Sequence, residues 1–453
     1  MTREEVLTIA KTTKFLQRNG GKIDCYDLLL TLVFRTASSL PIGLGLLTTF
    51  LNCLVSRTAL HKKFNERSVL FFKKCLFLIM SKRLTENMAP DISVFNKFTE
   101  VMIIDSSRWD IPAHMSWLFA GYGGSASKAN CKIQLCYDYK TGEAKIIQAT
   151  RGTIADQKYG RALPIIASKG MLFIFDLGYW VFDILKDIRD KKAFFLSRYR
   201  TQVELWIFDK NDKPVRLNFI EWLNSQQKNA VELQAYIQKY NEYLPVRVIA
   251  WKMPEEIANR RRMDLKYKAQ KKGRTPKSHS LAFCSWSVFA TNADDSLISG
   301  EMIRTCYRIR WNIELIFKAW KSVLNIHKTN VKTNTNRFRC ELYAKLILTV
   351  IIHRLYKYIH LLMWKAEKRE LSIDKFWKYM DSNKQKLHEM YKHGISNFIN
   401  YINQTLTHII MSCEKNHQKS RYTSLQMIDN MLGDLLPIKV KVYVYNEEIM
   451  TLG

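Results

Sequence analysis

Two aspartates each follow a short apolar run of the kind that forms a buried strand. Residues 100–104 run into Asp105, and residues 171–175 run into Asp176. If these strands are neighbours in one sheet, the two carboxylates lie side by side. Hard divalent cations such as Mg²⁺ prefer carboxylate oxygens, and two-metal sites that act on phosphodiesters hold their ions about 3.5–4 Å apart. Taken singly, an aspartate at a strand end is more often a turn former or a helix cap. A two-metal site also needs a third carboxylate.

The third carboxylate is expected on a helix over residues 301–323. Spacings of 3, 4 and 7 residues separate Tyr307, Arg310, Glu314 and Lys321. At about 100° per residue these four side chains fall within an arc of about 60° on one helix face. Such a stripe can be the polar edge of an amphipathic helix. It also suits a site in which Glu314 holds a cation while the other three side chains grip nearby phosphate oxygens.

The elements that must position these side chains change in type along the chain. The first hundred residues have helical apolar spacing, and residues 132–137 and 144–150 read as the two strands of a hairpin. A helical stretch is expected over 155–169, mainly strands over 190–300, and helices again to about residue 435. Alternation over 438–445 predicts one terminal strand. The pattern therefore predicts a mixed α/β (α+β) chain with helical ends.

Within the helical N-terminal part, one short basic helix could bind DNA. Ser56 is a good N-cap, and a helix that starts there displays Arg57, His61, Lys62 and Lys63. These residues make it a candidate recognition helix of a helix-turn-helix unit. A basic solvated face on an ordinary helical bundle explains the same residues equally well, because a helix-turn-helix has no sharp sequence signature.

The charge of the chain indicates its partner. The 453 residues carry 71 Lys and Arg against 41 Asp and Glu, which gives a formal net charge of +30. Such an excess favours binding to a polyanion, and nucleic acid is the leading partner. A basic segment at residues 260–277 is either a solvated face or a phosphate contact. No membrane partner is expected, because the most apolar stretches are interrupted by Lys73 and Lys74 or fall short of the roughly 20 residues that span a bilayer.

The nine cysteines form no Cys-x-x-Cys pair and no zinc-site spacing. We therefore expect reduced, buried thiols and a cytoplasmic protein. Cys131 and Cys136 are an odd number of residues apart on an expected strand, which puts them on opposite faces of the sheet. Residues 2–5 read as a helix capping box rather than as the start of a secretion signal.

The helical stripe also carries a family resemblance. The string Tyr307-x-x-Arg310-x-x-x-Glu314-x-x-x-x-x-x-Lys321 resembles the Y-R-E-K signature of bacterial insertion-sequence transposases of the DDE type, the group named insertion sequence four. Residues 104–107, 123–125 with 132–135, 176–179 and 310–321 look like the same group, so the resemblance spans about residues 100–350. It implies a ribonuclease-H-like catalytic core that is interrupted by a mainly β insertion before Glu314.

The resemblance implies a role for each matching residue. Asp105, Asp176 and Glu314 would be the catalytic triad and would hold two Mg²⁺ (or Mn²⁺) ions. The residues that contact the backbone of the transposon end would be Tyr307, Arg310 and Lys321.

A tryptophan is also implied, because in hairpin-forming relatives a tryptophan of the insertion's last strand stacks on a flipped base. Trp286 is the candidate here, and Trp311, beside Arg310, is a second. Stacking would offset part of the cost of extruding a base. Simple core packing is the other explanation for Trp286.

The resemblance and the pattern together divide the chain into five parts. We expect a helical DNA-end-binding domain at 1–95, the first part of the core at 96–190, a mainly β insertion at 191–299, the core helix with its glutamate at 300–355, and a helical C-terminal region with a terminal strand at 356–453.

The implied function is cut-and-paste transposition of an insertion sequence. The enzyme would bind the terminal inverted repeats as double-stranded DNA, cleave there with metal ions, and direct the freed 3′-hydroxyl at target DNA. A homodimer on paired ends and a cytoplasmic, nucleoid-associated location are implied as well. Two alternatives stay open at this point: a transposase-derived DNA-binding protein without cleavage activity, and a nuclease of the same fold that cuts without joining.

Overall fold

The computed structural model describes residues 1–17, 21–37, 42–82 and 93–415, so the terminal strand expected at 438–445 lies outside the described residues. The strands are β1 (Val101–Asp110), β2 (Asn130–Asp138), β3 (Ala144–Arg151), β4 (Leu172–Phe175), β5 (Phe194–Arg198), β6 (Leu205–Phe208), β7 (Pro214–Leu217), β8 (Ala230–Lys239), β9 (Glu242–Lys252) and β10 (Trp286–Thr291).

Helices surround these strands and form both ends of the described chain. They are α1 (Arg3–Thr12), α2 (Cys25–Arg35), α3 (Leu44–Thr48), α4 (Arg57–Lys63), α5 (Glu66–Ser81), α6 (Ser93–Asn96), α7 (Asp156–Gly160), α8 (Leu163–Ile166), α9 (Phe182–Asp190), α10 (Phe219–Asn224), α11 (Glu255–Gln270), α12 (Ser278–Ala282), α13 (Gly300–Arg308), α14 (Trp311–Ser322), α15 (Thr335–Glu367), α16 (Ile373–Ser382), α17 (Lys384–Lys392), α18 (Ile395–Gln404) and α19 (Leu406–Cys413).

All ten described strands belong to one mixed sheet with the order β3-β2-β1-β4-β5-β10-β9-β8-β6-β7. β4 pairs in parallel with both β1 and β5, and the other neighbours are antiparallel. The expected hairpin is confirmed as β2 and β3. The mixed sheet with its many helices is consistent with the fold that the resemblance implies. The β-rich segment over residues 191–299, for which the name insertion is kept below only as a label, extends this sheet, because its last strand, β10, pairs with β5.

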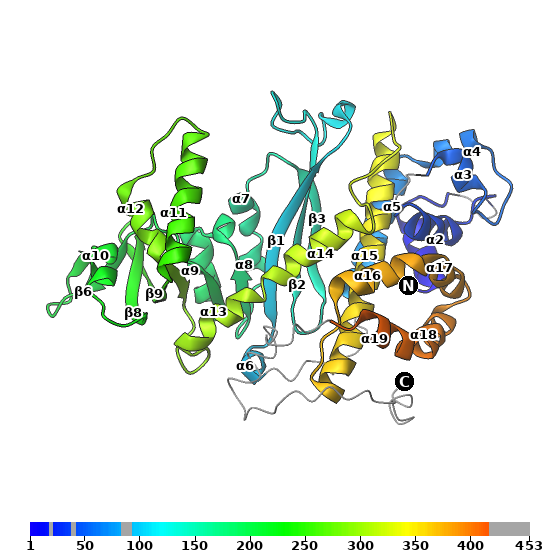
Figure 1. The fold of residues 1–453 in the computed structure, drawn as a ribbon. Coiled ribbons are helices and arrows are strands. Elements are labelled where there is room, and N and C mark those ends of the chain that lie inside the picture. Colours follow the sequence, from blue (N-terminus) through cyan, green and yellow to red (C-terminus); the bar gives the residue numbers. More distant parts are fainter. Residues whose placement is uncertain (18–20, 38–41, 83–92, 416–453) are drawn as a thin grey trace.

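The sheet separates two apolar cores. On one face, residues of β1, β2 and β4 pack with α2, α5, α14 and α15. On the other face, the alternate residues of the same strands pack with α7, α8, α9 and the inner strands of the insertion. Cys131 and Cys136 fall in different cores, which confirms that they lie on opposite faces of β2. Figure 1 shows the N-terminal helices beside α15–α18 at one end and the insertion at the other.

Three expected elements differ from the observed ones. β1 does not end at Asp105 but continues to Asp110, because its second half still pairs with β2. The helix expected over 155–169 is two short helices, α7 and α8. The helix expected over 301–323 is divided into α13 and α14 by a tight turn at Ile309 and Arg310.

The long helix α15 is apolar enough to be compared with a membrane span. In the described part of the chain it is the one helix whose length and composition would allow it to cross a bilayer, yet 89% of its most apolar 18-residue window is buried within the protein. It packs against α2 and α5 and runs through residue 355 without interruption. Its apolar surface is therefore used inside the fold.

Candidate active site

The sheet places the two aspartates side by side. The parallel pairing of β1 with β4 ends at Ile104 opposite Phe175, so Asp105 and Asp176 are the next residues on adjacent strands. Side chains alternate along a strand, and Ile103 belongs to the core that contains α14. Asp105, two residues further on, points to the same face. Asp176 does so by the same alternation from Ile174.

The turn between α13 and α14 brings three more side chains to this edge. Asn312 and Ile313 donate their N–H groups to the carbonyls three residues back, so the turn is tighter than an α-helix. The Asn312 side chain also donates to the Ile309 carbonyl at 2.8 Å. Side chains three residues apart eclipse one another in such a turn. Tyr307 and Arg310 therefore project in the same direction, towards the two aspartates.

Direct contacts join these groups. The Tyr307 hydroxyl donates to Asp176 Oδ1 at 3.3 Å. Arg310 Nη1 donates to Asp105 Oδ2 at 3.1 Å, and Arg310 Nη2 donates to Glu314 Oε1. Glu314 lies in the first turn of α14, one turn after Arg310. The structure thus gathers all three acidic residues expected from the sequence around one tyrosine and one arginine.

Lys321 lies further along α14, away from the carboxylates. Its Nζ donates to the carbonyl oxygen of Arg108 on β1 at 3.1 Å. Seven residues separate it from Glu314, which corresponds to about 10 Å along a helix. The four residues of the expected stripe therefore line a path along the α13–α14 unit, although they do not share one continuous helix.

The electrostatics of the site follow from its burial. The pKa of Asp105 is raised to about 6, chiefly by burial and to a smaller extent by the nearby carboxylates of Asp176 and Glu314. The backbone N–H of Ser106, which donates to Asp105 Oδ1 at 2.7 Å, and the Arg310 guanidinium partly offset this effect. Arg310 is thus the cation that compensates two of the three acids, Asp105 and Glu314.

The three carboxylates suit a hard cation, but Arg310 occupies the space between two of them. Carboxylate oxygens are the ligands that Mg²⁺ and Mn²⁺ prefer. Within residues 1–17, 21–37, 42–82 and 93–415, no three His, Cys, Asp or Glu side chains form a group that could hold an ion as they stand. The reason is visible in the contacts, because the Arg310 guanidinium stands between Asp105 and Glu314.

A cluster of three arginines beside the aspartates was not expected from the sequence. Arg198 ends β5, and because Phe175 pairs with Ser197, it lies next to Asp176 across the sheet. Its guanidinium lies 5.7 Å from the centre of the Tyr307 ring. Burial, with the nearby charges of Arg198 and Arg304, lowers the pKa of Arg261 on α11. An arginine that ends a buried strand is the same kind of signal that identified Asp105 and Asp176.

The two tryptophans differ in exposure. Trp286, the first residue of β10, is 4% exposed and packs in the core on the insertion side of the sheet. Its carbonyl oxygen accepts a hydrogen bond from Arg261 Nη1 at 3.2 Å. Trp311, which begins α14 beside Arg310, is 57% exposed. As the chain stands, Trp311 offers an aromatic surface and Trp286 does not.

The expected basic N-terminal helix is present as α4. The Ser56 side chain accepts a hydrogen bond from the N–H of Ala59 at 3.1 Å and caps this helix. Arg57 and Lys62 are exposed, whereas Lys63 is half-buried with its ammonium 5.6 Å from the centre of the Phe15 ring. Figure 1 shows α4 at the end of the molecule opposite the insertion, so these residues are not brought together with the aspartates.

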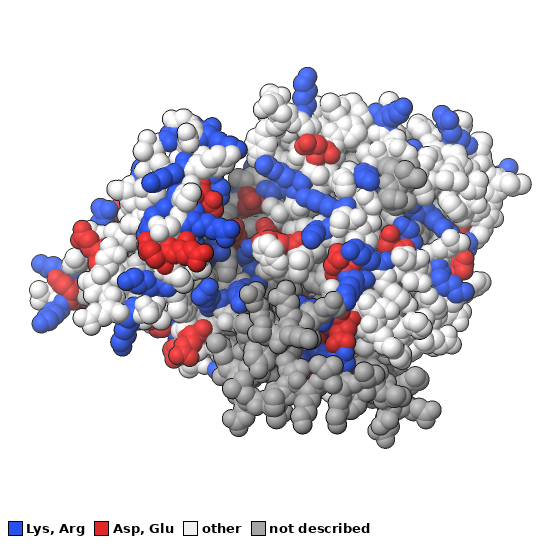
Figure 2. All heavy atoms as spheres, viewed as in Figure 1, with Lys and Arg blue, Asp and Glu red and all other residues white. Residues whose placement is uncertain are grey.

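One face of the protein is hollowed beside the elements that carry the site. Figure 2 shows a hollow between the insertion, with α11 and α12, and the part of the core that carries β1 and α14. Acidic side chains lie within this hollow, and Lys and Arg side chains line both of its sides. Such an arrangement favours the approach of an anionic chain to a group of carboxylates.

Comparison with known proteins agrees with this geometry. Residues 96–351 match the family model described as the transposase DDE domain. The chain is 27% identical over 446 residues to the transposase for insertion sequence element IS231E of Bacillus thuringiensis subsp. finitimus, which covers 94% of this chain and 91% of the relative. It is 27% identical over 447 residues to the transposase for insertion sequence element IS1151 of Clostridium perfringens, with 94% and 93% covered.

The matched family region contains β1, β4 and α14, and so all three acidic residues of the site. It extends over more than half of the chain, and the relatives match nearly all of it. The chain therefore belongs to the DDE transposases of bacterial insertion sequences.

Proposed function

We propose that this transposase cleaves DNA at the ends of its insertion sequence and joins the freed 3′-hydroxyl to target DNA. The observation that carries the proposal is the adjacency of Asp105 and Asp176 on parallel strands, with Glu314 linked to Asp105 through Arg310. Three carboxylates from distant parts of the chain meet around Tyr307 and Arg310, and Arg198 lies next to one of them across the sheet. Phosphodiester chemistry is the reaction class that needs both features.

Asp105, Asp176 and Glu314 are proposed to hold two Mg²⁺ or Mn²⁺ ions, which when bound would activate the attacking oxygen and stabilise the leaving one. Arg310 must leave its carboxylate partners for Glu314 to serve as a ligand. A DNA phosphate offers the guanidinium an alternative bidentate partner. DNA binding and completion of the acidic site would then be coupled through this one side chain.

The remaining cations would hold the DNA backbone. Tyr307, Arg310 and Lys321 are the proposed contacts to the transposon end, and Arg198, Arg261 and Arg304 would extend them towards the insertion. The exposed Trp311 is better placed than the buried Trp286 to stack on an extruded base, since stacking requires an accessible ring face. Arg57, Lys62 and Lys63 on α4 are proposed to bind the terminal repeat in a homodimer assembled on paired ends in the cytoplasm.

The test uses purified full-length protein and labelled DNA that carries the ends of its element. With Mg²⁺ we expect nicks at the element boundary, followed by products in which the 3′ end is joined to a second DNA. Glu314→Ala should abolish both products and retain end binding. Glu301→Ala, an exposed glutamate at the start of α13, is the matched control and should cleave normally.

Three results would contradict the proposal. Binding without cleavage by the unaltered protein would indicate a transposase-derived DNA-binding protein. Cleavage without joined products would indicate a nuclease of the same fold. Cleavage that persists in Glu314→Ala would remove this residue from the catalytic triad.

A further inference from the structure

The loop that connects β1 to β2 presents one tyrosine to solvent. Tyr122 is 62% exposed. The residues on either side of it are held in a narrow turn, because Gly121 N–H donates to the Lys128 carbonyl at 2.8 Å and Gly123 N–H donates to the Ser127 carbonyl at 3.3 Å. A Cβ on Gly121 would lie 2.2 Å from the Ser127 carbonyl oxygen, so this close approach requires glycine. Tyr122 is therefore an exposed ring on an ordered support.

A cation backs this ring on one side. The Arg108 guanidinium lies 5.1 Å from the centre of the Tyr122 ring, within the range of a cation–π contact. Lys321 adds a second charge, since its Nζ donates to the Arg108 carbonyl oxygen at 3.1 Å. Neither cation has a carboxylate partner in the part of the chain that the structure describes. Both charges are thus available to an anionic ligand.

A second exposed tyrosine with a cation against its ring provides a comparison. Tyr240, in the turn between β8 and β9, is 87% exposed, and the Lys239 ammonium lies 4.9 Å from the centre of its ring. Lys239, however, is ion-paired with Asp183 at 2.6 Å, so its charge is compensated within the protein. The Tyr122–Arg108 pair has the same ring–cation contact without that compensation.

The position of the pair fixes its relation to the acidic residues. Arg108 lies three residues after Asp105 on β1, about 10 Å further along the strand at about 3.3 Å per residue. Because side chains alternate along a strand, the Arg108 side chain leaves the face of β1 opposite Asp105. The pair is linked to the α14 side of the site through the Arg108 backbone, because its carbonyl oxygen accepts the hydrogen bond from Lys321.

We propose that Tyr122, backed by Arg108, stacks on an unpaired nucleobase of the DNA that reacts at Asp105 and Asp176. A base inside a duplex presents only its edges, whereas an unpaired base offers the π-face that an exposed ring can cover. Arg108 occupies one side of the Tyr122 ring and leaves the other side for the base. Arg108 and Lys321 bind the adjacent phosphates. The location of the base rests on the proposed function, but the stacking site itself does not.

The experiment measures binding by the full-length protein in EDTA, where cleavage does not interfere. Two DNA probes of one sequence are compared: a fully paired duplex, and the same duplex with three unpaired nucleotides at one end that include 2-aminopurine. The unaltered protein should bind the forked probe more tightly and change its 2-aminopurine fluorescence. Tyr122→Ala should weaken binding of the forked probe about 10-fold, the range expected for one stacked base, and leave the paired probe within about 2-fold.

Two further variants make the outcome decisive. Tyr122→Phe keeps the ring and should retain the preference for the forked probe, and Tyr240→Ala should match the unaltered protein. Unaltered fork binding by Tyr122→Ala would overturn the inference, as would an equal loss on both probes. Failure of the proposed function is a separate result, because it would appear as absent cleavage with Mg²⁺ while fork preference in EDTA still depends on Tyr122.

Discussion

Arg310, at the start of α14, is ion-paired with Asp105 in the middle of β1, with 3.1 Å between Nη1 and Oδ2. The same guanidinium binds Glu314, so one cation compensates two of the three acids. A metal ion that uses these carboxylates has to compete with it. This competition gives the first prediction.

Replacing Arg310 with alanine should tighten the binding of Mn²⁺ in the absence of DNA. In this variant Asp105 and Glu314 no longer pair with a guanidinium. Mn²⁺ therefore does not have to displace a partly buried charge-assisted hydrogen bond, which is worth about 1.5–3 kcal/mol. We expect an affinity increase of about 10-fold, measured by electron paramagnetic resonance of free Mn²⁺. Arg216→Ala, on the edge strand β7 and outside the arginine cluster, should leave the affinity unchanged. Weaker Mn²⁺ binding by Arg310→Ala would contradict the competition.

Tyr307 allows the roles of a ring and a hydroxyl to be separated. The ring is buried and lies 5.1 Å from the Phe289 ring between centres, while the hydroxyl donates to Asp176. Tyr307→Ala should destabilise the protein by about 3–5 kcal/mol, because it removes a large buried ring. Tyr307→Phe should change the free energy of unfolding by about 1 kcal/mol or less, yet reduce cleavage several-fold. Urea unfolding and a cleavage assay measure the two effects, and full activity of Tyr307→Phe would exclude a role for the hydroxyl.

The arginine cluster predicts a change in the salt dependence of DNA binding. Each phosphate neutralised by a cation contributes about 0.9 to the slope of log affinity against log salt concentration. Arg198→Gln should therefore lower the slope by about 0.9 and weaken binding to paired DNA of any sequence. Arg216→Gln is the matched control, since Arg216 on β7 is already ion-paired with Glu204 at 2.8 Å. Equal slopes for the two variants would show that Arg198 does not contact phosphate.

The pair of aspartates was predictable because its signal is local. An apolar run followed by a carboxylate marks a strand and its polar end, and the parallel pairing of β1 with β4 then sets Asp105 beside Asp176. The helix cap at Ser56 and the β2–β3 hairpin are local in the same sense. In each case the residues that specify the element lie within a few positions of one another.

The turn at Ile309 and Arg310 could not be predicted from the same kind of pattern. No proline or glycine interrupts the helical spacing there, and the turn tightens through hydrogen bonds that include the Asn312 side chain. Arg198 was missed for another reason, because its place beside Asp176 depends on the pairing of β4 with β5. The union of the insertion with the core sheet likewise depends on pairing between β5 and β10, more than 80 residues apart in sequence.

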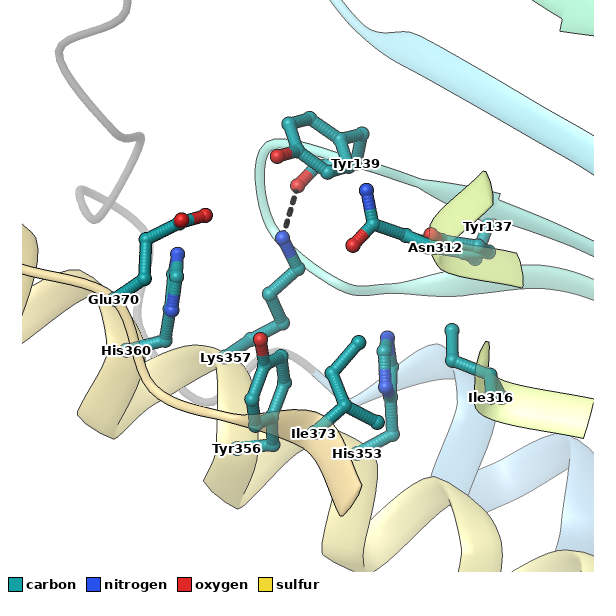
Figure 3. Close-up of a pocket in the computed structure, with 10 residues that line it drawn as sticks. All are labelled: Tyr137, Tyr139, Asn312, Ile316, His353, Tyr356, Lys357, His360, Glu370 and Ile373. Atoms are coloured by element: carbon teal, nitrogen blue, oxygen red, sulfur yellow. Dashed lines mark hydrogen bonds between the residues drawn. The ribbon is translucent and has the colours of Figure 1, made fainter. Parts of the chain in front are cut away.

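A buried polar cavity behind α14 gives the last prediction. It lies between the end of the β2–β3 hairpin, α14 and α15, as Figure 3 shows, and is lined by Tyr137, Tyr139, Asn312, Ile316, His353, Tyr356, Lys357, His360, Glu370 and Ile373. Neither ring nitrogen of His353 has a hydrogen-bond partner among the described residues. Burial, with smaller contributions from Lys357 and Arg354, lowers the pKa of His353 to about 3.

This histidine should make the protein less stable in mild acid. Unfolded histidine has a pKa near 6.5, so between about pH 6.5 and pH 3 the unfolded chain binds a proton that folded His353 does not. Stability is therefore lost as the pH falls through this range. His353→Phe keeps an aromatic ring and removes the proton site. The difference in free energy of unfolding, His353→Phe minus the unaltered protein, should increase by about 2 kcal/mol as the pH is lowered from 7 to 5. The size follows because each pKa unit is worth about 1.4 kcal/mol.

Urea unfolding of both proteins at pH 5, 6 and 7 measures this difference. The other histidines, including His360 in the same cavity, are present in both proteins and cancel in the comparison. The same substitution at the exposed His114 is the matched control, and we expect no comparable gain there. A pH-independent difference for His353→Phe would mean that His353 reaches water or a partner in the folded state, and that the cavity behind α14 is open rather than sealed.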